Sequence, residues 1–122
     1  MNKRFDELKI NNKINNQEIK YDDGRYIGEV VNGLAEGKGI WYGFNGNRYE
    51  GEWRNDKKEG KGIYYYHNGD RYEGDYRNGY FEGQGIAYFS NGDRRMGDFL
   101  NDKEIGKHVW LTKNGEVKIE NF

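Results

Sequence analysis

Two histidines and a recurring set of carboxylates are the residues in this chain that could do acid–base chemistry. Neither His67, beside an Asn-Gly dipeptide, nor His108 has a Ser, Cys or acidic partner at a spacing typical of catalysis. The carboxylates recur at regular intervals, whereas an active site is normally one constellation that breaks such a pattern. The segment Gly37-Lys-Gly39 and its copies lack the Lys-Ser/Thr pair that completes a phosphate-binding loop. The sequence therefore predicts no catalytic residues and no enzyme.

Composition limits the classes of protein further. The 122 residues include no cysteine, which excludes disulfides and thiolate metal sites, and we expect neither a metal nor a cofactor. The formal charge of -1 gives no general attraction to nucleic acid or to an anionic membrane. Charges spread through the first twelve residues argue against a signal peptide, and no segment is apolar for long enough to span a bilayer.

A 23-residue repeat determines which elements hold the polar and aromatic residues. Four full repeats run from Asp23 to Asn114. The recurring columns are Arg25, Arg48, Arg71 and Arg94; Tyr26, Tyr49 and Tyr72; Gly28, Gly51, Gly74 and Gly97; Asn32, Asn55, Asn78 and Asn101; and Gly37, Gly60, Gly83 and Gly106. So many columns in one register establish an internal repeat.

The second repeat, residues 46–68, shows the structure expected of each unit. In residues 48–54 an aromatic residue or glycine alternates with a charged residue, and a second alternating segment covers residues 60–66. This two-residue period is typical of half-buried strands, and the glycine content disfavours helix. We expect the polar segment Asn55–Glu59 to link the two strands and Asn68-Gly69 to turn the chain into the next repeat. Each repeat is therefore predicted to be a β-hairpin.

Glycines inside the alternating segments need a reason other than a turn, because glycine normally weakens a strand. Gly51, Gly62 and Gly74 lie in such positions. A missing Cβ lets an aromatic ring from a neighbouring strand lie flat on the backbone. We therefore expect tyrosine and tryptophan rings to stack on the glycine columns and to supply most of the core.

The predicted domain organisation is one repeat domain after a short leader. Residues 1–17 are interpreted as a loose or weakly helical leader, and residues 18–122 as the repeat domain. Its full units are 23–45, 46–68, 69–91 and 92–114, and residues 115–122 supply the first strand of a fifth unit. A preceding half-repeat is expected over residues 18–24. Two caps and eight strands in full units predict about ten strands, spaced by about 4.8 Å.

The unit resembles the MORN (membrane occupation and recognition nexus) repeat. The match lies in Arg48-Tyr-Glu-Gly-Glu-Trp53, Glu59-Gly-Lys-Gly62 and Asn68-Gly69, and it covers roughly residues 23–122. The fourth unit departs from the pattern, since Arg95 replaces the tyrosine and His108 the second glycine. The resemblance implies an all-β, elongated, curved, single-layer antiparallel sheet with an aromatic-lined groove. It also implies protein binding, because relatives act in cytoskeletal, ciliary, membrane-junction and signalling assemblies.

The aromatic side chains are the candidate binding groove, although their first role is to stack along the sheet. A single-layer sheet has no second layer to cover this face, so part of it should stay exposed and mark an interaction surface. The candidate groove residues are Tyr26, Tyr49, Trp53, Tyr64, Tyr66, Tyr72, Tyr76, Tyr88, Phe89 and Phe99. Tyr49, Trp53, Tyr72 and Tyr76 are the first choice because they belong to the most regular units.

Charged residues give two further expectations. Opposite the aromatics, the Arg column shares a face with an acidic column, which we interpret as a solvated salt-bridge ladder worth about 0–1 kcal/mol per pair. Basic residues at one hairpin end are a candidate site for phosphoinositide headgroups. Neighbouring Asp56 and Glu59 cancel much of their field, which disfavours lipid and, more strongly, nucleic acid. The acidic column is Glu29, Glu52, Asp75 and Asp98, and the basic group is Arg54, Lys57, Lys58 and Lys61.

Together these features predict a non-catalytic scaffold or adaptor that receives an extended or helical segment of a partner protein in the aromatic groove. The alternative is a peripheral membrane module that binds phosphoinositides through the basic hairpin end. A third interpretation is a homodimer, since the end strands of an open sheet have unpaired edges. The expected location is the cytoplasm, in association with the cytoskeleton, a cilium or a membrane surface.

Overall fold

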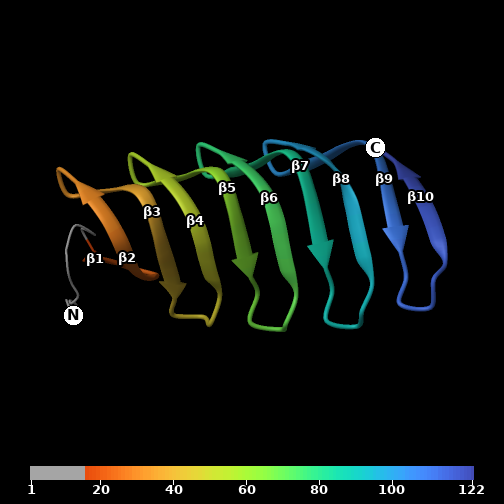
Figure 1. Ribbon diagram of the computed structural model, residues 1–122, viewed down its shortest axis with the longest axis horizontal. Helices are drawn as coiled ribbons and strands as arrows, with labels where there is room; N and C mark the ends of the chain where they lie inside the picture. The colour runs from red at the N-terminus through yellow and green to blue at the C-terminus, as the bar shows by residue number, and fades with distance from the viewer. Residues whose placement is uncertain (1–15) are drawn as a thin grey trace.

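The computed structural model describes residues 16–122, which form one open antiparallel sheet (Figure 1). The strands lie side by side in chain order, and no helix occurs in this part of the chain. The strands are β1 (Gln17–Tyr21), β2 (Gly24–Val31), β3 (Leu34–Gly43), β4 (Arg48–Arg54), β5 (Lys57–Tyr65), β6 (Arg71–Arg77), β7 (Tyr80–Tyr88), β8 (Arg94–Leu100), β9 (Lys103–Leu111) and β10 (Val117–Asn121). This confirms the predicted all-β sheet of consecutive hairpins.

A single strand stands at each end of the sheet. β1 pairs antiparallel with β2, and β10 pairs antiparallel with β9. The leader predicted at residues 1–17 lies outside the described residues, apart from Asn16 and Gln17, and Gln17 begins β1. β10 is the last strand in the order, so within the described part of the chain only β9 neighbours it.

Each full hairpin is closed by a two-residue turn in which both residues have positive φ. In the second hairpin these are Asn55 (φ 49) and Asp56 (φ 70). Asparagine, aspartate and glycine tolerate this conformation best, and the type I′ turn that results matches the right-handed twist of the strands. The link expected over Asn55–Glu59 is therefore wrong in length. β5 already begins at Lys57, so Lys58 and Glu59 are strand residues.

Side chains in the longer connections between hairpins hold the main chain of the next connection. The backbone N–H of His67 donates to Asn47 Oδ1 at 2.9 Å. Equivalent bonds join the following connections, from Ser90 to Asp70 and from Lys113 to the next aspartate. Neighbouring units are thus joined at their loops as well as along their strands.

A bulge interrupts each hairpin between the glycine column and the turn. In the second hairpin Gly51 pairs with Gly62 and Trp53 pairs with Lys58, so three residues of β5 lie opposite one residue of β4. Gly60, the middle residue of the three, has a φ of +72, where a residue with a side chain would be strained. Register shifts occur at the same place in the first and third hairpins and one residue earlier in the fourth. The two extra residues leave the alternation of faces unchanged, but they place Lys58, instead of Gly60, directly opposite Trp53.

The two faces of the sheet carry different side chains. The aromatic face carries the rings of Tyr26, Tyr49 and Tyr72 and the residues packed around them. The isoleucine face, on the opposite side, carries a row of directly paired residues that crosses six strands. In order across the sheet this row is Ile27, Ile40, Glu50, Ile63, Glu73 and Ile86.

Aromatic rings packed on glycines form the core. The ring of Tyr49 lies so close to the backbone of Gly62 that a Cβ there would overlap it, and the equivalent tyrosines of the first and third repeats do the same. Edge-to-face contacts then link the units, because the ring centroid of Tyr49 lies 5.2 Å from that of Trp53 and 5.0 Å from that of Tyr76. These contacts confirm the predicted reason for the glycines inside the strands.

The fourth repeat fills the same space from the opposite strand. Arg95 stands where earlier repeats have the tyrosine, and His108 stands where they have the second glycine. The fully buried imidazole of His108 lies against Gly97, and its Nε2–H donates to the carbonyl of Asp98 at 2.9 Å. Arg95 pairs with Glu104 at 2.9 Å. The departure of this unit is therefore a paired exchange, in which a ring from β9 replaces a ring from β8.

The arginine column does not pair with the acidic column. Arg48 pairs with Glu50, two residues further along the same strand, at 2.8 Å, and its guanidinium lies 4.1 Å from the ring centroid of Tyr65. Arg71 repeats both contacts one unit later. The predicted ladder is wrong because residues four apart in a strand are about 13 Å apart, against about 7 Å for residues two apart.

Candidate functional site

Most of the predicted groove residues form the core instead of an open surface. Six of the ten are buried, and Tyr26 and Tyr49 have no exposed surface at all. The six are Tyr26, Tyr49, Trp53, Tyr72, Tyr76 and Phe99. Burial raises the pKa of the four tyrosine hydroxyls in this set well above the usual value. All four first-choice residues are therefore inaccessible to a partner and hold the sheet together.

Tyr88 lies on the isoleucine face, so its assignment to the aromatic groove is wrong. It pairs with Arg71 in the ladder, and the Arg71 guanidinium lies 4.0 Å from its ring centroid. Ala87, the preceding residue, takes the position on the aromatic face opposite Tyr72. Successive strand residues point to opposite faces, so the alternation itself identifies Ala87 as the counterpart of Tyr64.

The accessible part of the aromatic face is a strip beside the buried rings. Trp41, Tyr64, Phe89 and Trp110 are half-buried, and Tyr66 is exposed. The ring centroids of Trp41 and Tyr64 are 6.4 Å apart, and those of Tyr64 and Tyr66 are 4.8 Å apart. Phe89 stacks on Trp110 with centroids 5.2 Å apart. We call these five residues the aromatic strip.

Two members of this strip, Trp41 and Trp110, are absent from the groove predicted from the sequence. Their signal was present, because positions 41, 64, 87 and 110 are spaced by 23 and hold Trp, Tyr, Ala and Trp. The column is less uniform than the tyrosine column of the first strands, so it gives a weaker signal. Tyr64, Tyr66 and Phe89 are the predicted groove residues that the structure leaves accessible.

Lys58 is enclosed by four rings of the aromatic face. Its Nζ lies 5.5 Å from the ring centroid of Tyr49 and 5.6 Å from that of Tyr64. The distance to the indoles of Trp41 and Trp53 is 5.9 Å in both cases. The negative faces of aromatic rings attract a cation over such distances. The second repeat thus holds an ammonium group inside a cage of rings.

No carboxylate in the described part of the chain contacts this ammonium group. Within residues 16–122 the Nζ of Lys58 makes neither a hydrogen bond nor an ion pair. Burial lowers the pKa of the amine, and the carboxylates of Asp102 and Asp23 oppose that shift from a distance. In the other full repeats the equivalent residues are Ala35, Phe81 and Glu104. Among the four full units, only the second has a cation at this position.

The structure separates the four basic residues that the sequence groups at one hairpin end. Lys58 is directed into the rings of the aromatic face. Lys61 lies on the opposite face, and its Nζ pairs with Asp75 at 2.6 Å. Arg54 and Lys57 are exposed neighbours beside the hairpin turn. Alternation along β5 is the cause, because residues an odd number of positions apart point to opposite faces of the sheet.

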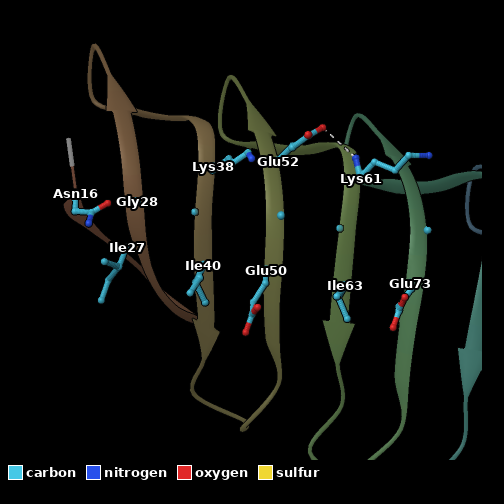
Figure 2. Close-up of a pocket in the computed structure, with 14 residues that line it drawn as sticks. Asn16, Ile27, Gly28, Lys38, Ile40, Glu50, Glu52, Lys61, Ile63 and Glu73 are labelled. Carbon is cyan, nitrogen blue, oxygen red and sulfur yellow. Dashed lines mark hydrogen bonds between the residues drawn. The ribbon is translucent and has the colours of Figure 1, made fainter. Parts of the chain in front are cut away.

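A hollow of about 670 Å³ lies on the isoleucine face (Figure 2). Glycine backbone forms its floor, and Ile27, Ile40 and Ile63 project beside it. A second hollow of about 400 Å³ continues toward β8, and Lys61 and Gly74 line both. The sequence prediction did not include this groove. Its signal is the 23-residue spacing of the isoleucines at 40, 63 and 86.

The two histidines do not share a site within the described residues. His67 is exposed in a connection, whereas His108 is buried in the core of the fourth repeat. Residues 16–122 contain no group of three side chains placed to ligate a metal ion. The same residues include no helix long and apolar enough to cross a membrane.

The fold and its surfaces define a repeat protein whose unit is a 23-residue β-hairpin and whose open sheet presents two extended faces. A family model described as the MORN repeat matches residues 26–48, 49–71 and 72–94, three consecutive units that make up more than half of the chain. The chain therefore belongs to the MORN repeat family, which confirms the resemblance seen in the sequence. No curated protein gives a significant match. Membership suggests a binding or scaffold role, since the MORN repeat is generally a non-enzymatic module.

Proposed function

We propose that this chain is a non-catalytic scaffold that binds a segment of a partner protein along the aromatic strip. The observation that supports this is a row of partly exposed rings on a face that no second layer of residues 16–122 covers. Aromatic side chains are enriched at the centres of protein interfaces, where they supply most of the binding energy. A surface of this composition suits a protein partner better than a polar ligand.

The geometry of the strip suits an elongated partner segment. It extends from Trp41 on β3 to Trp110 on β9. Six strand spacings separate these strands, which corresponds to roughly 29 Å. That length accommodates about nine residues of an extended segment or about nineteen of a helix. The buried rings beneath hold the strip rigid, so that little conformational entropy is lost when a partner binds.

Two neighbouring residues of β5 provide a matched test of this proposal. Tyr64 belongs to the aromatic strip, whereas Ile63 lines the hollow on the isoleucine face, and both are half-buried. Replacement by threonine places the same β-branched residue, which is favourable in strands, at either position. We expect Tyr64→Thr to weaken capture of a partner from extracts of the source cells at least tenfold. Ile63→Thr should leave capture within about twofold.

The opposite result would assign the partner to the isoleucine face. Loss of capture with Ile63→Thr and retention with Tyr64→Thr would refute the proposal in favour of the groove shown in Figure 2. Circular dichroism and the melting temperature of both variants must be recorded, because a variant that unfolds loses every surface. Partner binding unaffected by either change would also contradict the proposal.

Phosphoinositide binding has weaker support, because the basic residues expected to form the site point in different directions and Lys61 already pairs with Asp75. Co-sedimentation with phosphoinositide-containing vesicles tests this alternative. Salt-sensitive pelleting that Arg54→Gln and Lys57→Gln abolish would favour it, and no pelleting at any salt concentration would remove it. A cytoplasmic location, in contact with the cytoskeleton, a cilium or a membrane surface, belongs to the same proposal and can be checked by fluorescence microscopy of the tagged chain.

A further inference from the structure

No residue of the described range 16–122 accepts a hydrogen bond from the ammonium group of Lys58. Four ring centroids surround its Nζ at 5.5 to 5.9 Å, and no oxygen within residues 16–122 accepts a hydrogen bond from it. Rings attract the charge but accept hydrogen bonds poorly. The residue is half-buried, and its Nζ is not among the buried polar atoms without a partner, so solvent at the open side of the cage supplies its hydrogen-bond acceptors. A carboxylate arriving from that side can take the place of this water.

The fourth repeat shows the same arrangement with the missing group present. There Arg95 is the cation on the aromatic face, with its Cζ 5.3 Å from the ring centroid of Trp110 and 6.0 Å from that of Phe99. Its guanidinium also pairs with the carboxylate of Glu104 at 2.9 Å. Glu104 occupies the column that Lys58 occupies in the second repeat. One unit of this chain thus combines cation, rings and carboxylate, and another has the cation and rings alone.

We infer that the partner segment carries an aspartate or glutamate whose carboxylate pairs with Lys58, flanked by apolar residues that pack on Trp41 and Tyr64. This inference rests on the proposed function and adds the chemistry of the partner to it. A carboxylate over the cage would accept the hydrogen bonds that the rings cannot, and low local polarity would strengthen the pair. Tyr64 links the two parts, because its ring belongs both to the cage and to the strip.

A phage-displayed library of random twelve-residue peptides tests this without a known partner. Selection on the whole chain should enrich peptides that contain Asp or Glu next to aromatic or aliphatic residues. Parallel selection on Lys58→Met, which keeps the apolar stem and removes the charge, should lose the acidic residue and keep the apolar ones. Lys58→Arg, which restores a cation, should recover it.

Synthetic peptides from the selection give the quantitative comparison. Changing the peptide Asp to Asn, or Glu to Gln, should weaken binding to the natural chain about tenfold to a hundredfold, as for other hydrogen bonds between charged groups. The same change should have no effect on binding to Lys58→Met. An equal loss with both proteins would overturn the inference, because the acidic residue would then act elsewhere.

The outcomes separate this inference from the function on which it rests. Peptides that lose binding on Tyr64→Thr but carry no acidic residue would overturn the role of Lys58 and leave the aromatic strip as the binding surface. A selection that yields no peptide sensitive to Tyr64→Thr would contradict the proposed function itself. The expected result is an acidic preference with the natural chain and with Lys58→Arg but not with Lys58→Met, together with loss of binding on Tyr64→Thr.

Discussion

The exchange of ring and glycine in the fourth repeat predicts that two damaging substitutions repair each other. His108→Gly combined with Arg95→Tyr would give this unit the arrangement that Tyr49 and Gly62 have in the second. Each substitution alone should destabilise the protein, because the buried imidazole of His108 fills the space that the tyrosine fills elsewhere.

The magnitudes follow from the contacts that each change removes. His108→Gly deletes a fully buried ring and its hydrogen bond to Asp98, which should cost about 3–4 kcal/mol, with up to about 1 kcal/mol more for the freedom of glycine. Arg95→Tyr adds a ring where one already lies, at a cost of about 1–3 kcal/mol. It also breaks the partly exposed ion pair with Glu104, worth at most about 1 kcal/mol.

The double variant should lose about 2–3 kcal/mol less unfolding free energy than the sum of the two single losses. In the double variant a single ring, that of the new tyrosine, occupies the space that His108 and the tyrosine share in Arg95→Tyr. Urea unfolding of the four proteins, followed by tryptophan fluorescence, measures this coupling energy. Losses that add within about 0.5 kcal/mol would refute the reasoning. They would mean that the two positions do not share one ring site.

Three further predictions concern the core and the end of the sheet. Above pH 10 stability should fall by about 1.4 kcal/mol per pH unit for each buried tyrosine, because a raised pKa in the folded state means that only the unfolded chain releases the proton there. Lys58, with its lowered pKa, acts in the opposite sense as pH rises toward 10.5, but it is one group against several. The buried tyrosines are Tyr26, Tyr49, Tyr72 and Tyr76. Urea unfolding at pH 9 and at pH 11 measures the net change in the free energy of unfolding, and equal stability at the two pH values would contradict the prediction. Gly62→Ala should lower the free energy of unfolding by about 3 kcal/mol or more, because the new methyl group displaces the Tyr49 ring. Gly106→Ala, in open space at a φ of +69, should lower it by only about 1–2 kcal/mol. Equal shifts in the melting temperature of the two variants would argue against the ring contact. We also propose that two copies pair through β10, whose Ile119 is 56% exposed. Light scattering should then show concentration-dependent dimers that Ile119→Lys abolishes, and a monomer at every concentration would disprove this.

The period of 23 and the alternation within it were sufficient to predict the sheet. Hairpin pairing joins residues close in sequence, so the columns that recur together also lie together in space. The ring-on-glycine core followed from the same pattern, because glycines such as Gly62 have no other reason to stand in a strand. The position of Tyr88 could also have been predicted, since strict alternation places it on the face opposite Tyr72.

The candidate site was less predictable because it depends on the bulge. Tyr49 and Tyr64 both alternate toward the aromatic face, but only the first lies down on a glycine and becomes fully buried. The polar composition of Asn55–Glu59 indicated a loop, whereas a two-residue turn and a bulge at Gly60 make most of it strand. Lys58 therefore enters the ring cage, which no sequence column indicates, since its counterparts are Ala35, Phe81 and Glu104.

Pairing between consecutive strands alone has a consequence for how the molecule reaches its native state. No strand in residues 17–121 must wait for a distant part of the chain before it finds its neighbours. An all-β protein ordinarily folds slowly because its contacts are far apart in sequence, but this topology keeps the loops that must close short. Assembly can start at any hairpin and spread in both directions, and one more 23-residue module would lengthen the array without disturbing the modules already present.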